Sequence, residues 1–372
     1  MRWPASPAPT AAARCPVADG APRLQRITDY PALLAGAWAE AHAPREPNAP
    51  TVISTFAGCG GSSLGYHMAD FRELLAVEWE QNAADTFRLN FPDVPLYHGD
   101  IAKLSVEECL RRAGIAPGEL DVFDGSPPCQ GFSTSGKREM GDQRNQLFRE
   151  FVRLLTGLRP RAFVMENVSG MVKGDFKLIF AEILRTLKGC GYRVKVRLLN
   201  AMFFGVPQAR ERMIFIGVRD DLGIEPSHPS GWSEPTTPRT AFVDVDTVDS
   251  KPLAPWLLKA AAEMDAGNYS RDHVMRAFIK HKGTPGSSMS TKLLSWDRPS
   301  CTIIKQEIGA SGIIHPNRAR YLSTGELRRI GSFPDAFRFT DRKNAVERIG
   351  NSVPPLLMRS IARHVRTLVA RG

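Results

Sequence analysis

The sequence predicts an α/β protein in which a doubly wound, Rossmann-like sheet is joined to a smaller, irregular domain. Short apolar strands alternate with amphipathic helices from Thr51 to about residue 220, which is typical of a mostly parallel sheet covered on both faces. Polar and charged residues recur just after these strands. Ligands of open α/β sheets bind at the carboxyl ends of the strands, so the sequence also predicts where a site lies.

Composition narrows the class of protein. The chain has 372 residues, of which 42% are hydrophobic and 24% charged, as expected for a globular protein rather than a disordered one. No apolar run approaches the roughly 20 residues of a membrane span, so no membrane partner is expected. The net charge of +10 favours a polyanionic partner, nucleic acid first. The six cysteines form no CxxC pair, which predicts reduced thiols and neither disulfides nor a metal site.

Residues 1–49 are expected to be disordered or to form an extra N-terminal segment. The first 24 or so are rich in Ala, Pro and Arg without any period, which suits a disordered tail, with a targeting peptide as the alternative. One short helix is predicted at Tyr30–Ala43, followed by a linker at Pro44–Pro50.

Residues 50–220 are predicted to form the domain that carries the sheet. The segment Asn145–Leu158, for example, has apolar residues at helical spacing. The expected helices are Gly61–Tyr66, Asn82–Asn90, Val106–Ala113, Asn145–Leu158 and Phe176–Leu187. The expected strands are Thr51–Phe56, Leu74–Val77, Pro95–Tyr97, Val122–Phe123, Ala162–Met165, Val194–Leu199 and Met213–Val218.

Residues 221–338 are predicted to form the second domain. Pro, Gly, Ser and basic residues are frequent up to residue 319, without a strong helical period. The basic residues could face phosphate, although scattered charges are by default solvated. A helix is expected at Ser323–Arg329. The segment 339–372 then returns to the first domain through a turn at Gly350–Pro355 and a last helix at Leu356–Ala370.

A glycine-rich turn, Phe56-Ala-Gly-Cys-Gly-Gly61, joins the first strand to a helix. It matches neither GxGxxG nor a phosphate loop, so it indicates a nucleoside-like cofactor or merely a tight turn. Glu78 ends the next strand and suits a ribose diol, and Trp79 can stack on adenine. Asp100-Ile101 could flank the base on its other side. Three strand ends without a pyrophosphate signature favour S-adenosylmethionine over NAD.

The stretch Asp121–Ser133 ends a strand in a Ser and two prolines and then presents Cys129. Prolines cannot continue the ladder and they stiffen the turn, which suits a covalent catalyst. An inert buried thiol is the alternative. Glu166-Asn167 should lie beside Cys129 on the neighbouring strand, so that a nucleophile and an acid share a cleft. Arg210 and Arg212 alternate along an extended segment, so one can face the cleft and the other can support it.

With these residues assembled, the chain resembles the DNA cytosine-5 methyltransferase family from Thr51 to Ala370. Two departures are visible: Ile330-Gly331-Ser332 stands where relatives usually have a Gln-Gly pair, and residues 1–50 have no counterpart. The family's blocks occur in the usual order: Phe56-Ala-Gly, Glu78-Trp79, Asp100-Ile101, Pro128-Cys129-Gln130, Glu166-Asn167-Val168, Gln208-x-Arg210-x-Arg212, Gly331-Ser-Phe-Pro-Asp335 and Gly350-Asn-Ser-Val353.

The resemblance implies methyl transfer from S-adenosylmethionine to carbon 5 of a flipped-out cytosine in a specific duplex sequence, through a covalent Cys129 adduct. Catalysis is then expected from Cys129, Glu166, Arg210 and Arg212. The expected cofactor site comprises Phe56, Ala57, Gly58, Gly60, Glu78, Trp79, Asp100, Ile101, Pro128, Leu147, Asn351, Ser352 and Val353. Expected DNA contacts are Pro127, Ser133, Ser135, Lys137 and Asn167, with residues 221–338 as a target-recognition domain. A cytoplasmic monomer bound to DNA is expected, with a cognate restriction endonuclease as a candidate partner.

Two alternatives remain on the same fold. The first is a tRNA cytosine-5 methyltransferase, but such relatives usually carry a Cys-Phe-Thr tripeptide where this chain has Cys301-Thr302 after Pro299-Ser300. The second is a non-catalytic DNA-binding regulator, which the presence of both Cys129 and Glu166 disfavours. The recognised DNA sequence has no readable code in the chain.

Overall fold

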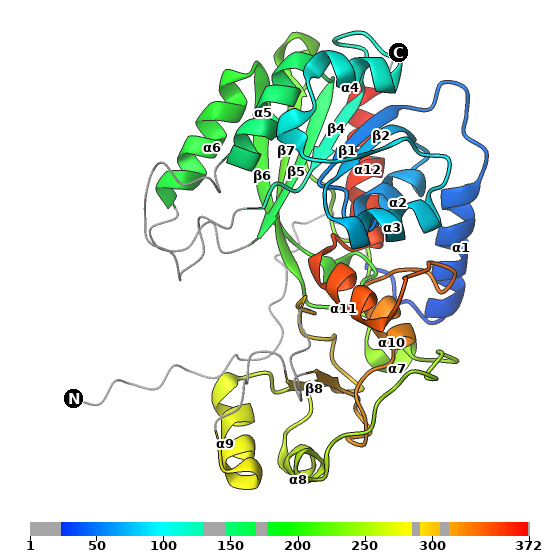
Figure 1. Cartoon of the computed structure of the whole chain (residues 1–372), viewed down its shortest axis with the longest axis vertical. Coiled ribbons are helices and arrows are strands. Elements are labelled where there is room, and N and C mark those ends of the chain that lie inside the picture. Colours follow the sequence, from blue (N-terminus) through cyan, green and yellow to red (C-terminus); the bar gives the residue numbers. More distant parts are fainter. Residues whose placement is uncertain (1–23, 129–145, 169–176, 285–290, 306–311, 371–372) are drawn as a thin grey trace.

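The computed structural model describes residues 24–128, 146–168, 177–284, 291–305 and 312–370. A seven-stranded sheet lies at its centre, with the strand order β3-β2-β1-β4-β5-β7-β6 (Figure 1). The expected α/β sheet is therefore confirmed. The strands are β1 Thr51–Thr55, β2 Arg72–Glu78, β3 Leu96–His98, β4 Val122–Gly125, β5 Ala162–Val168, β6 Tyr192–Asn200 and β7 Glu211–Arg219.

Six of the seven strands run in one direction, and β7 alone is reversed. β3, β2, β1, β4 and β5 pair in parallel, whereas β7 is antiparallel to both β5 and β6. Because β7 runs in reverse, its first residues lie at the edge of the sheet where β4 and β5 end. Val168 at the end of β5 is opposite Arg212 at the start of β7.

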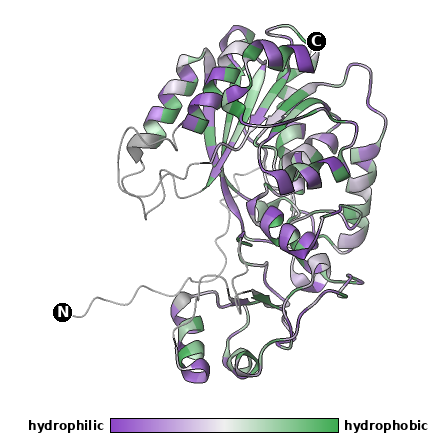
Figure 2. Cartoon of the chain, in the orientation of Figure 1, coloured by the Kyte–Doolittle hydropathy of each residue, from purple (hydrophilic) through white to green (hydrophobic). Residues whose placement is uncertain are grey.

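Helices cover both faces of the sheet (Figure 1). One apolar cluster joins one face to α1, α2, α3 and α12, and a second joins the other face to α4, α5 and α6. The sheet interior is accordingly hydrophobic in Figure 2. These helices are α1 Tyr30–His42, α2 Gly61–His67, α3 Gln81–Asn90, α4 Val106–Ala113, α5 Gln146–Leu158, α6 Lys177–Gly189 and α12 Pro355–Val369.

Local sequence explains where several of these helices begin and end. In α4 the Ser105 side chain accepts a hydrogen bond from the Glu108 N–H, and Gly114 ends the helix in the left-handed region. α2 and α12 approach closely at Gly65, where an added Cβ would lie 2.5 Å from the Cβ of Met358. No helix within the described ranges is both long and apolar enough to cross a bilayer.

Region 221–338 contains more helix than the sequence predicts. α8 Pro255–Glu263 and α9 Arg271–Lys282 pack on each other around a separate apolar cluster, beside the short strands β8 Lys292–Leu293 and β9 Ile313–Ile314. The sequence shows no strong helical period up to residue 319, so these two helices were not predicted. α9 buries Val274, Ala277 and Phe278 at helical spacing, but the many basic residues in and around this stretch hide the period. α7 Pro238–Ala241 and α10 Thr324–Ile330 complete the region.

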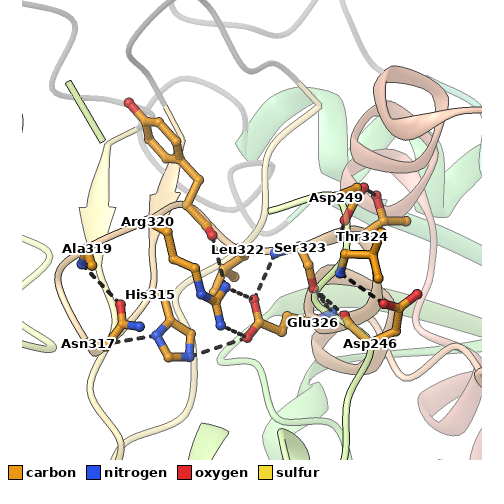
Figure 3. A network of polar contacts seen from close by, with 12 residues as sticks. Asp246, Asp249, His315, Asn317, Ala319, Arg320, Leu322, Ser323, Thr324 and Glu326 are labelled. Carbon is orange, nitrogen blue, oxygen red and sulfur yellow. Dashed lines mark hydrogen bonds and ion pairs between the residues drawn. The ribbon is translucent and has the colours of Figure 1, made fainter. Parts of the chain in front are cut away.

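A buried polar network fastens β9 to α10 (Figure 3). The carboxylate of Glu326 binds Arg320 through both oxygens at 2.7 Å and lies 3.3 Å from Nε2 of His315. Glu326 also forms a capping box with Ser323, the N-cap of α10. The Ser323 hydroxyl donates to the carbonyl of Asp246. One carboxylate thus holds three parts of region 221–338 together.

Near the chain ends, one expected helix is present and one expected turn needs correction. Residues 1–23 lie outside the described residues, and the helix expected at Tyr30–Ala43 is α1, which buries Tyr30 and Leu34 in the main core. The turn expected at Gly350–Pro355 begins too early. A further helix, α11 Arg342–Asn351, includes Gly350 and Asn351 and is capped by Asp341.

Candidate active site

The glycine-rich turn between β1 and α2 depends on backbone conformations that favour glycine. Gly58 and Gly60 have φ values of 58° and 95°, and even Phe56 has φ 54°. A Cβ on Gly60 would lie 2.3 Å from the Phe91 ring. On Gly61 it would lie 2.6 Å from the carbonyl oxygen of Val353. The turn is therefore close-packed against α3 and against the segment that follows α11.

The Glu78 carboxylate, at the end of β2, organises the neighbouring backbone. Its Oε2 accepts from the N–H of Gly58 at 2.7 Å, and its Oε1 accepts from the N–H groups of Trp79 and Glu80 at 2.8 and 2.7 Å. These three bonds leave a lone-pair site on Oε2 that can accept from a hydroxyl group. The adjacent Trp79 side chain is 75% exposed, so its ring is accessible to an adenine.

Other predicted cofactor residues gather around this turn. Phe56, Ile101 and Leu147 belong to one apolar cluster on the α4–α5–α6 face of the sheet. Asp100 caps a short 3-10 turn, Ile101–Lys103, by accepting from the N–H of Ala102. The glycine turn, the end of β2 and the turn after β3 thus form a continuous edge, as three strand ends facing one nucleoside require.

The Gly350–Val353 block, near the other end of the chain, packs against the glycine turn. The Ser352 hydroxyl donates to the carbonyl of Arg348 at 2.7 Å and lies 3.3 Å from the sulfur of Cys59, although 293 residues separate Ser352 from Cys59. Burial raises the pKa of the Cys59 thiol to about 11, so it stays neutral. Val353 is buried, whereas Asn351 is exposed at the end of α11.

The loop that follows β4 is tied to the end of β5. The side-chain amide of Asn167 donates to the carbonyl of Pro127 at 3.2 Å, and Gly125 pairs with Met165 in the parallel register. Pro127 therefore lies beside the end of β5, at the residue that follows Glu166. The predicted residues Cys129, Ser133, Ser135 and Lys137 fall outside the described residues, which end at Pro128 and resume at Gln146.

Glu166 and Arg212 form the charged centre of this edge. The Nε of Arg212 lies 2.5 Å from Oε1 of Glu166, and both side chains are largely buried. The reverse direction of β7 creates this pair, because Arg212 enters the sheet opposite the end of β5. A carboxyl and a guanidinium side by side can bind a planar group that has a ring N–H beside a carbonyl.

The Arg210 side chain points into the protein, where its guanidinium is hydrogen-bonded to backbone carbonyls. Its guanidinium donates to the carbonyls of Ile303, Gly350 and Ser352 at 3.1, 2.9 and 2.8 Å. Burial lowers its pKa to about 9, with Arg212 acting in the same direction and Glu166 against it. Arg210 is therefore still a buried cation at neutral pH. It links β7 to region 221–338 and to the segment beside the glycine turn.

A family model for C-5 cytosine-specific DNA methylases matches residues 50–367, which include every described part of this edge. The chain belongs to this family. Its donor is S-adenosylmethionine, and the reaction is transfer of a methyl group to carbon 5 of cytosine in DNA. This methylase is therefore an enzyme, and the expected family, fold, cofactor and activity are confirmed.

Individual relatives agree with this assignment. The methylase is 36% identical over 336 residues to the Type II methyltransferase M1.HphI of Haemophilus parahaemolyticus, covering 85% of this chain and 86% of that one. It is 31% identical over 354 residues to M.NgoPII of Neisseria gonorrhoeae, covering 88% and 98%. The fold matches a solved DNMT2 structure from Spodoptera frugiperda with TM-score 0.62 at 19% identity, covering 85% and 99%.

Sequence reasoning assigned no role to several residues that shape the site of the methylase. Gln208 is buried and joins distant segments: its amide donates to the carbonyl of Ile330 at 3.2 Å, and its oxygen accepts from the Ile303 N–H at 3.1 Å. Its place two residues before Arg210 in the quoted motif was the available signal. Asp124 on β4 accepts from the Tyr66 hydroxyl at 3.1 Å, and no local pattern reveals that long-range pair.

The described part of the methylase offers no cluster of three or more His, Cys, Asp or Glu side chains that could hold a metal ion. The cofactor residues, in contrast, fit their group. An exposed indole, a fixed carboxylate and close-packed glycines at one sheet edge provide the stacking surface, the hydroxyl acceptor and the backbone approach that an adenosine needs.

Proposed function

We propose that the methylase works through a covalent bond between the sulfur of Cys129 and carbon 6 of a cytosine flipped out of duplex DNA. One observation carries the proposal. The Glu166–Arg212 pair lies at the end of β5, where Asn167 anchors Pro127, two residues before Cys129. A stacked base cannot reach such an enclosed edge, so the target cytosine must leave the helix.

The order of bond changes follows from cytosine chemistry. Carbon 5 is a poor nucleophile until the Cys129 thiolate adds to carbon 6 and converts the ring to an enamine. Bound S-adenosylmethionine supplies an electrophilic methyl group. A base then accepts the proton on carbon 5, and the electron pair left behind expels the Cys129 thiolate and restores the aromatic ring.

Glu166 and Arg212 act on the base itself in this scheme. Arg212 engages Oε1 of Glu166, which leaves the second carboxyl oxygen for ring N3 of the cytosine. A proton held between Glu166 and N3 draws electrons from the ring as the thiolate adds. The Arg212 guanidinium can contact the neighbouring carbonyl of the base. Arg210 supports the site from behind through its three carbonyl partners.

The remaining assignments divide between cofactor and DNA. Glu78 binds the ribose, Trp79 stacks on the adenine with Asp100-Ile101 on its other side, and Pro128 and Asn351 complete the pocket with the residues around the glycine turn. Ser133, Ser135 and Lys137 contact DNA from the loop after Cys129. Region 221–338 selects the target sequence, and the net charge of +10 favours binding to the phosphates.

The biological setting completes the proposal. The methylase acts as a monomer in the cytoplasm, on a specific sequence in the cell's own DNA. Its relatives M1.HphI and M.NgoPII are Type II methyltransferases, which supports a place in a restriction–modification system beside an endonuclease of the same specificity. Bisulfite sequencing of a plasmid propagated with the enzyme identifies that sequence.

A trapping experiment tests the covalent step. A duplex with 5-fluorocytosine at the target position cannot lose its carbon-5 substituent as a proton, so the adduct should accumulate and survive denaturing electrophoresis. Cys129→Ser should form no adduct and transfer no labelled methyl group, while still binding S-adenosylhomocysteine and duplex DNA. The control is Cys190→Ser, a change at a thiol that is hydrogen-bonded to Thr156 and Thr186, which should behave as wild type.

Two outcomes would count against the proposal. Robust methyl transfer by Cys129→Ser would refute the covalent role of this cysteine. Labelled methyl groups that appear in tRNA but not in duplex DNA would refute the substrate assignment and favour the tRNA alternative.

A further inference from the structure

Arg348, near the end of α11, is a buried arginine to which the proposed mechanism gives no role. Its side chain is only 3% exposed. NH1 and NH2 donate to the two carboxyl oxygens of Glu80 at 2.7 and 3.0 Å, and NH2 lies 2.8 Å from the carboxylate of Glu347. A bidentate arginine–carboxylate pair fixes the direction of both side chains as well as their separation.

The partner of this pair adjoins the proposed adenosine site. Glu80 follows Glu78 and Trp79, and its own N–H donates to Oε1 of Glu78 at 2.7 Å. Glu78 in turn receives the N–H of Gly58 in the glycine turn. Holding the Glu80 side chain therefore fixes the backbone that positions the Glu78 carboxylate and sets the direction in which Trp79 leaves the chain.

The backbone of Arg348 fixes the opposite wall. Its carbonyl accepts both the hydroxyl and the N–H of Ser352, at 2.7 and 3.0 Å. Ser352 lies 3.3 Å from Cys59 in the glycine turn. Arg348 therefore contacts two of the segments around the proposed nucleoside site directly: the one after β2, through Glu80, and the one after α11, through Ser352. It reaches the third segment, the glycine turn, through Ser352.

We propose that Arg348 is a positioning residue of the cofactor site, which holds Glu80 so that Glu78 and Trp79 are ordered before S-adenosylmethionine binds. The inference rests on the proposed roles of Glu78 and Trp79. A site ordered in advance binds more tightly, because less conformational freedom is lost on binding. Arg348 itself touches neither the cofactor nor the base in this arrangement.

The test compares Arg348→Gln, Glu80→Gln and the double variant by calorimetric titration with S-adenosylhomocysteine. Each single change should weaken binding roughly tenfold, and the double variant should be no weaker than either single variant, because both remove one interaction. The KM for S-adenosylmethionine should rise similarly, while kcat and the KM for DNA change less than twofold. Since Glu80 is 43% exposed, Glu80→Gln should fold even if Arg348→Gln does not.

Glu347→Gln is the matched control. It removes the other carboxylate that pairs with Arg348, but the Arg348–Glu80 pair that leads to Glu78 remains, so S-adenosylhomocysteine affinity should stay within twofold of wild type. If Glu80→Gln also stays within twofold while Glu78→Ala weakens binding, the role of Arg348 is refuted and the adenosine site stands. If Glu78→Ala also leaves the affinity for S-adenosylhomocysteine unchanged, the cofactor assignment itself fails.

Discussion

Replacing Arg210 with methionine is the sharpest test of how the site is held together. Methionine keeps most of the buried apolar stem and removes the guanidinium. Three carbonyls then lose their donor: Ile303 in region 221–338, and Gly350 and Ser352 beside the glycine turn. The substitution therefore disconnects the start of β7 from two segments that are far from it in the sequence.

The expected size of the effect follows from these contacts. A hydrogen bond to a charged group contributes about 1.5–3 kcal/mol, and the loss of three is partly offset because a charge no longer has to be buried, at a cost of several kcal/mol. We expect a net loss of about 2–4 kcal/mol of unfolding free energy. For a chain of 372 residues that corresponds to a melting temperature lower by roughly 3–5 °C.

Thermal unfolding followed by circular dichroism measures this change, with Arg197→Met as the control. Arg197 lies on the neighbouring strand β6 but is exposed, so its loss should shift the melting temperature by less than about 2 °C. Titration with S-adenosylhomocysteine should also show weaker binding to Arg210→Met, because Ser352, whose carbonyl Arg210 holds, lies against the glycine turn. Equal melting temperatures for the two variants would refute the reasoning.

Three further substitutions probe the same edge of the sheet. Glu78→Ala should weaken S-adenosylhomocysteine binding at least tenfold and DNA binding far less; equal losses in parallel titrations would contradict the ribose assignment. Gly61→Ala should cost about 1–3 kcal/mol by overpacking, because its Cβ would lie 2.6 Å from the Val353 carbonyl, and an unchanged melting temperature would show that the turn yields. Burial raises the pKa of the Asp124 carboxyl well above its usual range, so the folded protein retains a proton that the unfolded chain loses as the pH rises through about 4. Wild-type stability should therefore fall with rising pH relative to Asp124→Asn, and melting both proteins at pH 4 and pH 8 would expose the opposite trend.

The order of elements around the sheet was predictable because each strand and helix there has a clear local pattern. The helix predicted at Val106–Ala113 has the observed bounds of α4, since Ser105 and Gly114 mark its ends. The reversal of β7 was not predicted, because a strand has the same alternation in either direction. Only the paired register shows that Arg212 meets Glu166.

The helices that the sequence did not predict have weak or misleading local patterns. α11 buries Ala345, Val346 and Ile349 but is otherwise polar, and it runs through Gly350, which usually ends a helix. Its stability comes from tertiary contacts such as the bond from the Thr86 hydroxyl to Asn344. The pairing of Arg348 with Glu80 could not be predicted either, because it joins segments 268 residues apart.

The position of α12 has a consequence for how the enzyme is made. This last helix covers α2 and one face of the sheet, and the segment just before it lies against the glycine turn. During synthesis, the sheet and region 221–338 leave the ribosome before α12 can pack on that face beside α1, α2 and α3. The main core closes only when α12 appears, so a chain terminated before α12 lacks part of both its core and its cofactor pocket. Such a fragment should be cleared as misfolded protein rather than persist as an inactive competitor for DNA.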